Sequence, residues 1–284
     1  MLFAHSFSAT EEFLFKNLTK YTPVVQLDLT QIPDKAGLTD QLRYSNDSLL
    51  LYSFQKLEHY THIDSFRREC EIADYLVEHV IEKEYRKIIL LTYPGSYFNS
   101  SNLFLQHKGI IEQKFVNTGI PCTLLNIQAI GDAVFHVNNL HELFYDRYHH
   151  QYLIPQRSNF FVYSIQLRTL VKLLLKAMNG HYAGRYDVFD TISDLRDYLL
   201  RYSKVPKVQR MAPVYLYFKS LLGQYPSLTM LELFLQGTVP MYKFRTEKEF
   251  DVPLPEDTIP VNQQHPVQAY PLHHDSSLKW HPLI

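Results

Sequence analysis

Residues 87–132 indicate the fold, and they read KIILLTYPGSYFNSSNLFLQHKGIIEQKFVNTGIPCTLLNIQAIGD. Lys87–Thr92 is a short, continuous apolar run of the kind that forms a strand buried on both faces. A turn at a Pro-Gly pair follows, and Phe104–Asn117 then has the apolar spacing of a helix. Pro121–Ile127 is a second strand candidate. The order strand, helix, strand predicts a parallel sheet with helices on its faces.

The same alternation continues on both sides of this stretch. On its N-terminal side it predicts strands at Met1–Ala4, Pro23–Leu29 and Ser48–Ser53 and helices at Thr10–Leu18 and Ser65–Glu84. On its C-terminal side it predicts an extended segment at Asn159–Tyr163, a helix at Gln166–Met178 and a strand at Arg185–Phe189. A helix that Thr191 caps follows and ends near Tyr202. Further helical segments are predicted at Pro206–Leu222 and Ser227–Gln236. The predicted fold class is α/β, with a doubly wound, parallel, Rossmann-like sheet.

We expect three regions along the chain. Residues 1–160 form a Rossmann-like domain, residues 161–239 a smaller α/β lobe of the substrate type that is partly interleaved with it, and residues 240–284 an extended proline-rich tail. Seven of the 15 prolines lie in the tail, which prevents long regular elements there. The tail either wraps the body or is mobile, and Trp280, the only tryptophan, favours docking.

Composition excludes several classes of function. The net charge of the 284 residues is -1, with Lys+Arg 28 and Asp+Glu 29, which gives no electrostatic footprint for a nucleic acid. Cys70 and Cys122 are the only cysteines, too few for a disulfide framework or a cysteine-only zinc site. The chain has no apolar run of about 18 residues and no signal-peptide pattern at its start. We expect a cytoplasmic protein that binds neither nucleic acid nor membrane.

Glycine is scarce in this chain. There are 9 glycines, whereas average usage of about 7% gives roughly 20. Aromatic residues make up 14%, with Tyr 21 and Phe 18. We therefore expect bulky side chains where related folds have close backbone approaches.

Residues 87–132 resemble the middle of an atypical or extended short-chain dehydrogenase/reductase, including the NmrA-like branch. In that family the fifth strand ends in a Ser-rich loop, the next helix carries a lysine and then a glutamate, and a "sGi.ytilRp" strand follows. The matching positions in this chain are Lys108, Glu112, Gly119, Ile120, Thr123 and Leu124. Residues 160–199 are similar to a second block of the family. The resemblance covers most of residues 1–222 and implies a Rossmann fold of the type that binds NAD(P).

The cofactor motif of this family is a glycine-rich turn, GxxGxxG, between the first strand and the first helix. The motif places His5, Ser8 and Glu11 of this chain at the three glycine positions. Ser8 and Glu11 instead have the spacing of a capping box, and Glu11 and Glu12 put negative charge at the positive end of the helix dipole. We expect the diphosphate position to be blocked, so that no cofactor binds.

Five positions are weak candidates for contacts to NAD(P) if a cofactor does bind. His5, Ser6 and Ser8 lie in the first turn, and Ser53 ends a predicted strand. Asp28 lies 23 positions after His5, where the family places the acid that binds the adenosine ribose. An aspartate at the end of a strand also suits a turn, so both interpretations of Asp28 stay open.

The resemblance implies a proton-donating tyrosine four residues before the helix lysine, and this chain has Phe104 there. A phenyl ring cannot exchange a proton. The catalytic candidates that remain are Lys108 and, at the end of the fifth strand of the family pattern, Thr92 and Tyr93. Lys108 is either a contact for a ribose or phosphate, and thus a further cofactor candidate, or a solvated lysine paired with Glu112.

Tyr93 and Tyr97 flank the Pro-Gly turn at the carboxyl end of a strand, which is where doubly wound folds bind ligands. These tyrosines either contact a ligand or fill the vacant cofactor space. The abundance of aromatic residues favours the second interpretation.

Histidine and aspartate clusters give no metal site. Adjacent residues on an extended segment point to opposite sides, so neither His149–His150 nor His273–His274 chelates well. A group of acids has spacing expected near a helix N-terminus, namely Asp187, Asp190, Asp194 and Asp197. We expect no metal.

Three hypotheses about function follow. The preferred one is a catalytically degenerate short-chain dehydrogenase-like protein that binds a small ligand or a protein partner in a regulatory or accessory role. The second is an active, atypical NAD(P)-dependent oxidoreductase or sugar-nucleotide epimerase that holds its cofactor through Asp28 and Lys108. The third is a structural subunit that docks through its tail. Each is compatible with a homodimer.

Overall fold

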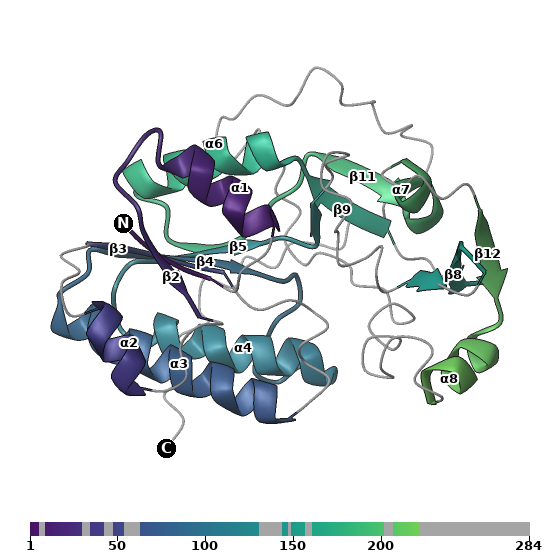
Figure 1. Cartoon of the computed structure of the whole chain (residues 1–284), viewed down its shortest axis with the longest axis horizontal. Helices are drawn as coiled ribbons and strands as arrows, with labels where there is room; N and C mark the ends of the chain where they lie inside the picture. The colour runs from purple at the N-terminus through teal and green to yellow at the C-terminus, as the bar shows by residue number, and fades with distance from the viewer. Residues whose placement is uncertain are drawn as a thin grey trace, which may run out of the picture.

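The computed structural model of the chain describes residues 1–5, 9–29, 35–42, 48–53, 63–130, 144–146, 149–156, 161–201 and 207–221 (Figure 1). Several features of the sequence analysis lie outside these residues. They are Ser6, Ser8, the predicted helix Ser227–Gln236, His273–His274 and the whole tail.

A six-stranded parallel sheet forms the centre of the structure, in the order β10-β5-β4-β3-β1-β2. Its strands are β1 (Leu2–His5), β2 (Val25–Asp28), β3 (Leu49–Ser53), β4 (Lys87–Thr92), β5 (Cys122–Asn126) and β10 (Gly184–Asp187). The chain runs from β1 to β2 on one side and then crosses to β3 on the other side. The topological switch point therefore lies between β1 and β3, and the predicted doubly wound, Rossmann-like fold is confirmed.

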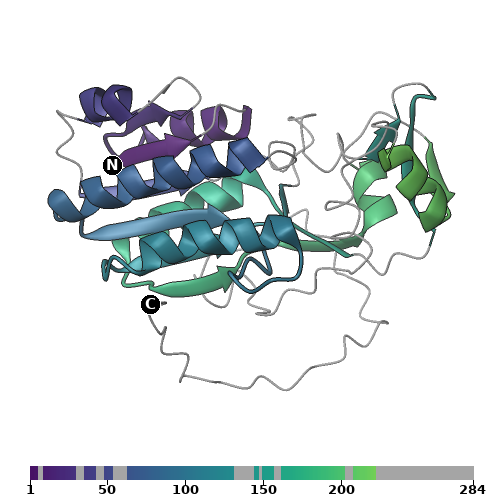
Figure 2. The same cartoon turned by 90° about the horizontal axis from the view of Figure 1, so that it is seen from below.

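Helices cover both faces of this sheet (Figures 1 and 2). One face carries α2 (Lys35–Leu42), α3 (Ile63–Glu82) and α4 (Leu103–Val116), and the other carries α1 (Ala9–Leu18) and α6 (Leu167–Asn179). Successive residues of a strand point to opposite faces, so Ile88 and Leu90 pack toward α3 and α4 while Ile89 and Leu91 pack toward α1 and α6. Two helix layers explain why the four inner strands, β1, β3, β4 and β5, are buried along their whole length.

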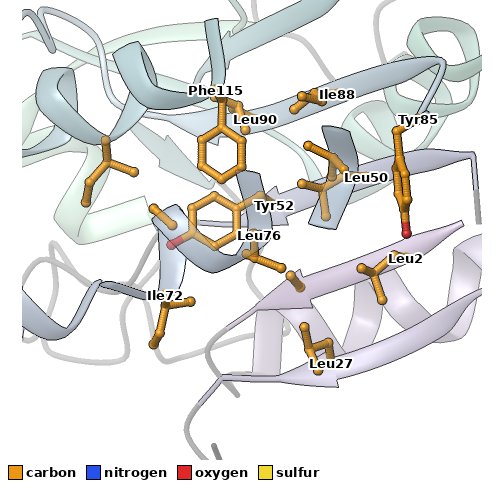
Figure 3. Packing of buried hydrophobic residues seen from close by; sticks show 14 of the residues in the cluster. Leu2, Leu27, Leu50, Tyr52, Ile72, Leu76, Tyr85, Ile88, Leu90 and Phe115 are labelled. Atoms are coloured by element: carbon orange, nitrogen blue, oxygen red, sulfur yellow. The ribbon is translucent and has the colours of Figure 1, made fainter. Parts of the chain in front are cut away.

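Figure 3 shows the core between the sheet and the α3–α4 layer. The rings of Tyr52 on β3 and Phe115 on α4 pack at a centroid distance of 5.3 Å. Ile72 and Leu76 on α3 lie one turn apart on the helix face that meets the sheet, and each is nearly or fully buried. Burial of each such side chain contributes about 1.5–3 kcal/mol to stability.

A smaller lobe lies to one side of the large sheet (Figures 1 and 2), as the sequence predicted. Its first sheet has the order β11-β9-β6, with β6 (Ala129–Ile130), β9 (Phe161–Ile165) and β11 (Thr191–Asp194). Its second sheet has the order β12-β8-β7, with β7 (Tyr145–Asp146), β8 (Gln151–Pro155) and β12 (Val208–Met211). The helices here are α7 (Leu195–Arg201) and α8 (Pro213–Leu221).

Two predicted elements in this lobe are wrong in part. Thr191 does not cap a helix, because Thr191–Asp194 pairs with β9 as a strand and the side chain of Asp194 accepts from the backbone N–H of Arg196 at 2.7 Å. The helix predicted from Pro206 begins only at Pro213, and Val208–Met211 is a strand paired with β8. Proline suits the first turn of a helix and not its interior.

The predicted group of aspartates also divides between different elements. Asp187 ends β10, and Asp190 accepts from the backbone N–H of Gln166 at 2.9 Å. Within the described part of the chain, no three His, Cys, Asp or Glu side chains are placed to hold a metal ion. Of the helices described here, none is both long enough and apolar enough to cross a bilayer.

Candidate functional site

All six strands of the large sheet end on a polar residue. In sheet order from the β2 edge, these residues are Asp28, His5, Ser53, Thr92, Asn126 and Asp187. The strands are parallel, so the six side chains line one edge of the sheet. Doubly wound folds bind ligands at this carboxyl edge, which makes it the candidate site.

Glu11 occupies the switch point at this edge. It lies in the first turn of α1 and is only 7% exposed, and its Oε1 accepts a hydrogen bond from Ser53 Oγ at 3.0 Å. The family motif has its third glycine at this position, where it lets the helix approach the sheet. Here the space between α1 and the end of β3 holds a carboxylate. Glu12 points elsewhere and pairs with Lys16 on the surface at 2.5 Å.

His5 fills the position of the first glycine of the motif. Its side chain is 0% exposed, and its Nε2 lies 2.8 Å from Gln26 Nε2 on the neighbouring strand. The imidazole ring also packs 4.7 Å from the ring of Phe3. Asp28, the ribose candidate, is partly buried opposite His5 in the register of β1 and β2.

These residues do not fit a dinucleotide bound in the manner of the motif. The motif uses glycine so that the backbone can come close to the diphosphate, and any side chain at these positions occupies that space. Of the three glycine positions, the structure describes His5 and Glu11, and both carry buried side chains. A diphosphate that approached α1 would meet the Glu11 carboxylate at short range, where like charges repel.

Lys108 is buried between α3 and α4. Its side chain is 3% exposed, its Nζ lies 3.7 Å from Glu69 Oε1 on α3, and the same nitrogen is 5.7 Å from the centre of the Phe104 ring. Burial lowers the pKa of Lys108 to about 8, against the opposing effect of the carboxylates of Glu69 and Glu112. The interpretation of Lys108 as a solvated lysine paired with Glu112 is therefore wrong, because its ion-pair partner is Glu69.

Glu69 links Lys108 to the sheet. Tyr52 Oη donates to Glu69 Oε1 at 3.5 Å, and burial, with the nearby Glu69 charge, raises the pKa of Tyr52 well above its usual value. The sequence analysis did not identify Glu69. A signal was present, since Glu69 falls on the apolar stripe of α3 with Ile72 and Leu76, where an acid needs a buried partner.

The two other catalytic candidates lie in different surroundings. Thr92 Oγ1 donates to the Glu112 carboxylate. Tyr93 is buried with Phe104 and α7 residues such as Tyr198, and its ring meets that of Phe104 edge to face at 5.5 Å. Tyr97 is not part of this cluster, because its ring lies against the guanidinium of Arg185, 4.9 Å from Cζ.

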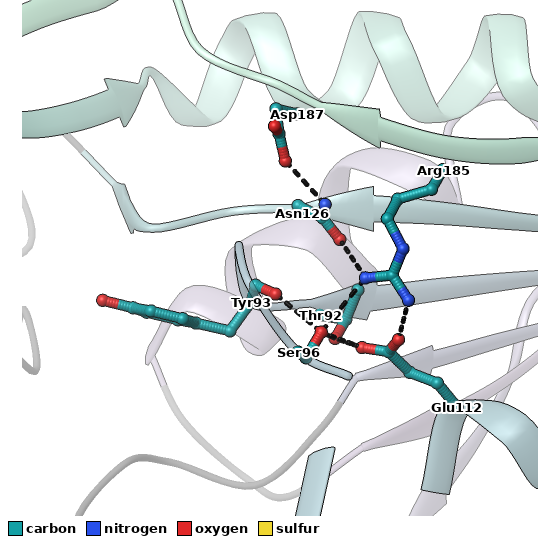
Figure 4. A network of polar contacts seen from close by, with 7 residues as sticks. All are labelled: Thr92, Tyr93, Ser96, Glu112, Asn126, Arg185 and Asp187. Carbon is teal, nitrogen blue, oxygen red and sulfur yellow. Dashed lines mark hydrogen bonds and ion pairs between the residues drawn. The ribbon is translucent and has the colours of Figure 1, made fainter. Parts of the chain in front are cut away.

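Figure 4 shows the polar network that surrounds Thr92. The Glu112 carboxylate accepts from Thr92, Ser96 and Arg185. Arg185 also donates to Ser96 Oγ at 3.1 Å and to Asn126 Oδ1 at 3.2 Å, and Asn126 Nδ2 donates to Asp187 Oδ1 at 2.6 Å. Burial raises the pKa of Glu112, while Arg185 and the two hydroxyl groups oppose that rise. The network joins the ends of β4, β5 and β10 to α4.

Gly109 allows the loop after β4 to cross α4 closely. A Cβ atom at Gly109 would lie 2.1 Å from the carbonyl carbon of Tyr97 and 2.4 Å from the backbone nitrogen of Phe98. Only glycine fits such an approach. The loop thereby holds Ser96 and Tyr97 against Glu112 and Arg185.

His149 and His150 have separate partners in the small lobe. His149 Nδ1 lies 2.8 Å from Asp146 Oδ2, and His150 Nδ1 lies 2.9 Å from Tyr145 Oη. The two rings therefore do not converge on a common ligand position.

Comparison with known proteins yields similarity in structure only. Neither a family model nor a curated protein matches the chain. The *Bordetella bronchiseptica* enzyme WbmG, solved in complex with NAD, superposes with a TM-score of 0.63 at 11% identity, over 90% of each chain. The *Citrobacter* triphenylmethane reductase, complexed with NADP(H), gives a TM-score of 0.62 at 13% identity, over 90% of this chain and 96% of that one.

A *Thermus thermophilus* UDP-glucose 4-epimerase, in complex with NAD, gives a TM-score of 0.58 at 12% identity, over 75% of this chain and 86% of that one. Identities this low establish the fold and leave the chemistry open. The similar structures are those of sugar-nucleotide epimerases and reductases, as the resemblance of residues 87–132 implied. The chain has the Rossmann-like fold seen in these epimerase and reductase structures.

Proposed function

We propose that this protein is a catalytically degenerate member of its fold type, which acts by binding a small ligand or a protein partner in a regulatory or accessory role. The observation that carries the proposal is the Glu11 carboxylate, buried at the switch point and bonded to Ser53 at 3.0 Å. A binding protein needs the scaffold and not the diphosphate position, whereas an NAD(P)-dependent enzyme needs both.

The surroundings of the helix lysine support the same proposal. Phe104 stands where the family has its proton donor, and it is 2% exposed and packed against Tyr93. Lys108, which in the family lowers the pKa of that donor, instead pairs with Glu69 in the α3–α4 layer. Hydride transfer to a carbonyl needs a proton for the resulting oxygen anion, and neither residue is placed to provide one.

A second candidate function rests on the fold. Enzymes with this fold were solved with NAD or NADP(H), so an atypical oxidoreductase or a sugar-nucleotide epimerase is the alternative. In that case Asp28, at the end of β2, is the residue that suits an adenosine ribose. Backbone contacts without glycine would have to hold the diphosphate.

Calorimetric titration separates the two candidates. The full chain is titrated with NAD+, NADH, NADP+ and NADPH, and the *Citrobacter* triphenylmethane reductase serves as the positive control with NADP(H). We expect heat of binding from the reductase and none from this protein. Specific binding in the micromolar range by this protein would contradict the preferred function and support the alternative.

The variant Glu11→Gln tests whether the negative charge of Glu11 prevents a dinucleotide from binding. It keeps the size of the side chain and its ability to accept from Ser53, but it removes the negative charge. If charge repulsion alone keeps a dinucleotide out, Glu11→Gln gains affinity for NAD(P), while His5→Gly, which only makes space, does not. We expect neither change alone to restore binding, because His5 and Glu11 both fill the turn.

A further inference from the structure

Helix α8 has an apolar face directed away from the protein. Figures 1 and 2 place this helix at the outer end of the small lobe, away from the large sheet. Three of its side chains are exposed, namely Val214 at 67%, Tyr215 at 47% and Phe218 at 63%. Exposed apolar side chains that adjoin one another mark a surface that another element covers.

The inner contacts of α8 fix which face points outward. Leu216 is fully buried against Leu153 of β8, and Lys219 Nζ lies 3.2 Å from Asp146 Oδ2 on β7. Val214 and Phe218 are four residues apart and thus adjoin on one stripe of the helix. That stripe lies on the side opposite Leu216. A helix of nine residues is marginal by itself and gains stability from apolar packing.

The chain that follows α8 has the features of a second helix. Residues 222–284 continue from the end of α8, and the sequence predicts a helix at Ser227–Gln236. Within that segment the polar residues Thr229, Glu232 and Gln236 recur at intervals of three and four, which places them on one narrow stripe. The remaining positions are mostly apolar, so such a helix would require cover over most of its circumference.

The connection between the two helices is short enough for a hairpin. Residues 222–226 read LGQYP, and antiparallel helix pairs are joined by about 2–5 residues. Gly223 suits the position just after a helix, and a helix does not continue through Pro226. Residue 221 before this loop pairs with residue 227 after it, and counting outward places Met230 opposite Phe218 and Phe234 opposite Val214. The two apolar stripes therefore match in register.

We propose that the exposed face of α8 is an intramolecular docking surface, and that residues 227–236 occupy it as the second helix of an antiparallel hairpin. Val214 and Phe218 pack against Phe234 and Met230, while Thr229, Glu232 and Gln236 face the solvent. The tail from Pro240 then starts near the Pro213 end of α8. This inference is independent of the proposed function.

Disulfide trapping in the full chain tests the register. The native cysteines are free, so Cys70→Ser and Cys122→Ala provide a background without them. The pair Phe218→Cys with Met230→Cys is compared with the pair Phe218→Cys with Thr229→Cys, in which the second cysteine lies one position away on the polar stripe. We expect an intramolecular disulfide on mild oxidation in the first pair and none in the second, because cysteines that point apart cannot be bridged.

The other outcomes overturn the proposal. Disulfide-linked dimers would mean that a second copy of the chain covers α8, and equal trapping in both pairs, or trapping in neither, would mean that residues 227–236 do not dock in this register. Amide hydrogen exchange provides a second measurement that needs no cysteines. Met230→Asp with Phe234→Asp should accelerate exchange in residues 213–221 by at least about tenfold, whereas Thr229→Asp with Gln236→Asp should not.

Discussion

Glu11 and Ser53 are 42 residues apart in the chain, and their side chains meet at 3.0 Å between α1 and the end of β3. Both residues lie where a Rossmann-like enzyme receives the diphosphate of its cofactor. The Glu11 carboxylate lies in the first turn of α1, at the positive end of the helix dipole, where an anion is favourable. Under the proposed function, this carboxylate takes the place of the phosphate that an enzyme of this fold binds there.

Opening the turn should not create an enzyme. In the variant Ser8→Gly with Glu11→Gly, two of the three glycines of the motif are restored, but Phe104 still stands at the position of the proton donor. We expect no oxidation of NADH or NADPH above that of the wild-type chain, followed by absorbance with a panel of carbonyl substrates. Turnover by this variant would mean that another residue donates the proton.

Much of the fold was predictable because buried parallel strands are continuous apolar runs. Lys87–Thr92 was predicted as a strand and has those bounds in the structure. The local sequence did not predict elements whose structure depends on pairing with a neighbouring strand. Thr191–Asp194 has residues that suit a helix start, but pairing with β9 makes it a strand. The two-residue β7 is too short to give any pattern.

The position of the candidate site was predictable from the sequence, but the side-chain contacts of its residues were not. The sequence placed Ser53 and Thr92 at strand ends, and both lie at the carboxyl edge of the sheet. The partner of Lys108 could not be found from spacing, because Glu69 belongs to another helix. Arg185 likewise comes from β10, far along the chain from Glu112. Contacts of this kind depend on tertiary packing.

Gly109 should not tolerate a side chain. Gly109→Ala places a Cβ atom 2.1 Å from the carbonyl carbon of Tyr97, so the loop or the helix must shift. We expect the free energy of unfolding to fall by about 1–3 kcal/mol, measured by urea denaturation. Gly119→Asn is the control, because its φ of +74° is accessible to asparagine and its Cβ would have nothing within 4 Å. Equal losses in both variants would contradict the close approach.

Lys108 should be important for stability through Glu69. Lys108→Met removes the cation from a buried ion pair and leaves the carboxylate buried without it. We expect a loss of about 3–5 kcal/mol in the free energy of unfolding. The double variant Lys108→Met with Glu69→Gln should recover most of that loss, since it removes the remaining charge. A double variant as unstable as Lys108→Met alone would show that the lysine contributes mainly by packing.

The stability of the wild-type chain should depend on pH through the same lysine. Lys108 keeps its proton up to about pH 8 when folded and up to about pH 10.5 when unfolded. Between these values the unfolded chain binds more protons, so the contribution of Lys108 to the free energy of unfolding rises with pH. Urea denaturation across this range should give a more positive slope for the wild type than for Lys108→Met. Identical slopes would mean that the pKa of Lys108 is not lowered.

Lys87 should stabilise the C-terminus of α6. Its Nζ donates to the carbonyl oxygen of Ala177 and, at 2.6 Å, to that of Gly180. These carbonyl groups are at the negative end of the helix, where a cation is favourable. Lys87→Met keeps the length of the side chain and removes both hydrogen bonds, which should cost about 1.5–3 kcal/mol of unfolding free energy. Lys172→Met, on the exposed face of α6, should change it by less than about 0.5 kcal/mol. If the two variants are equally stable in urea, Lys87 does not anchor α6 to β4.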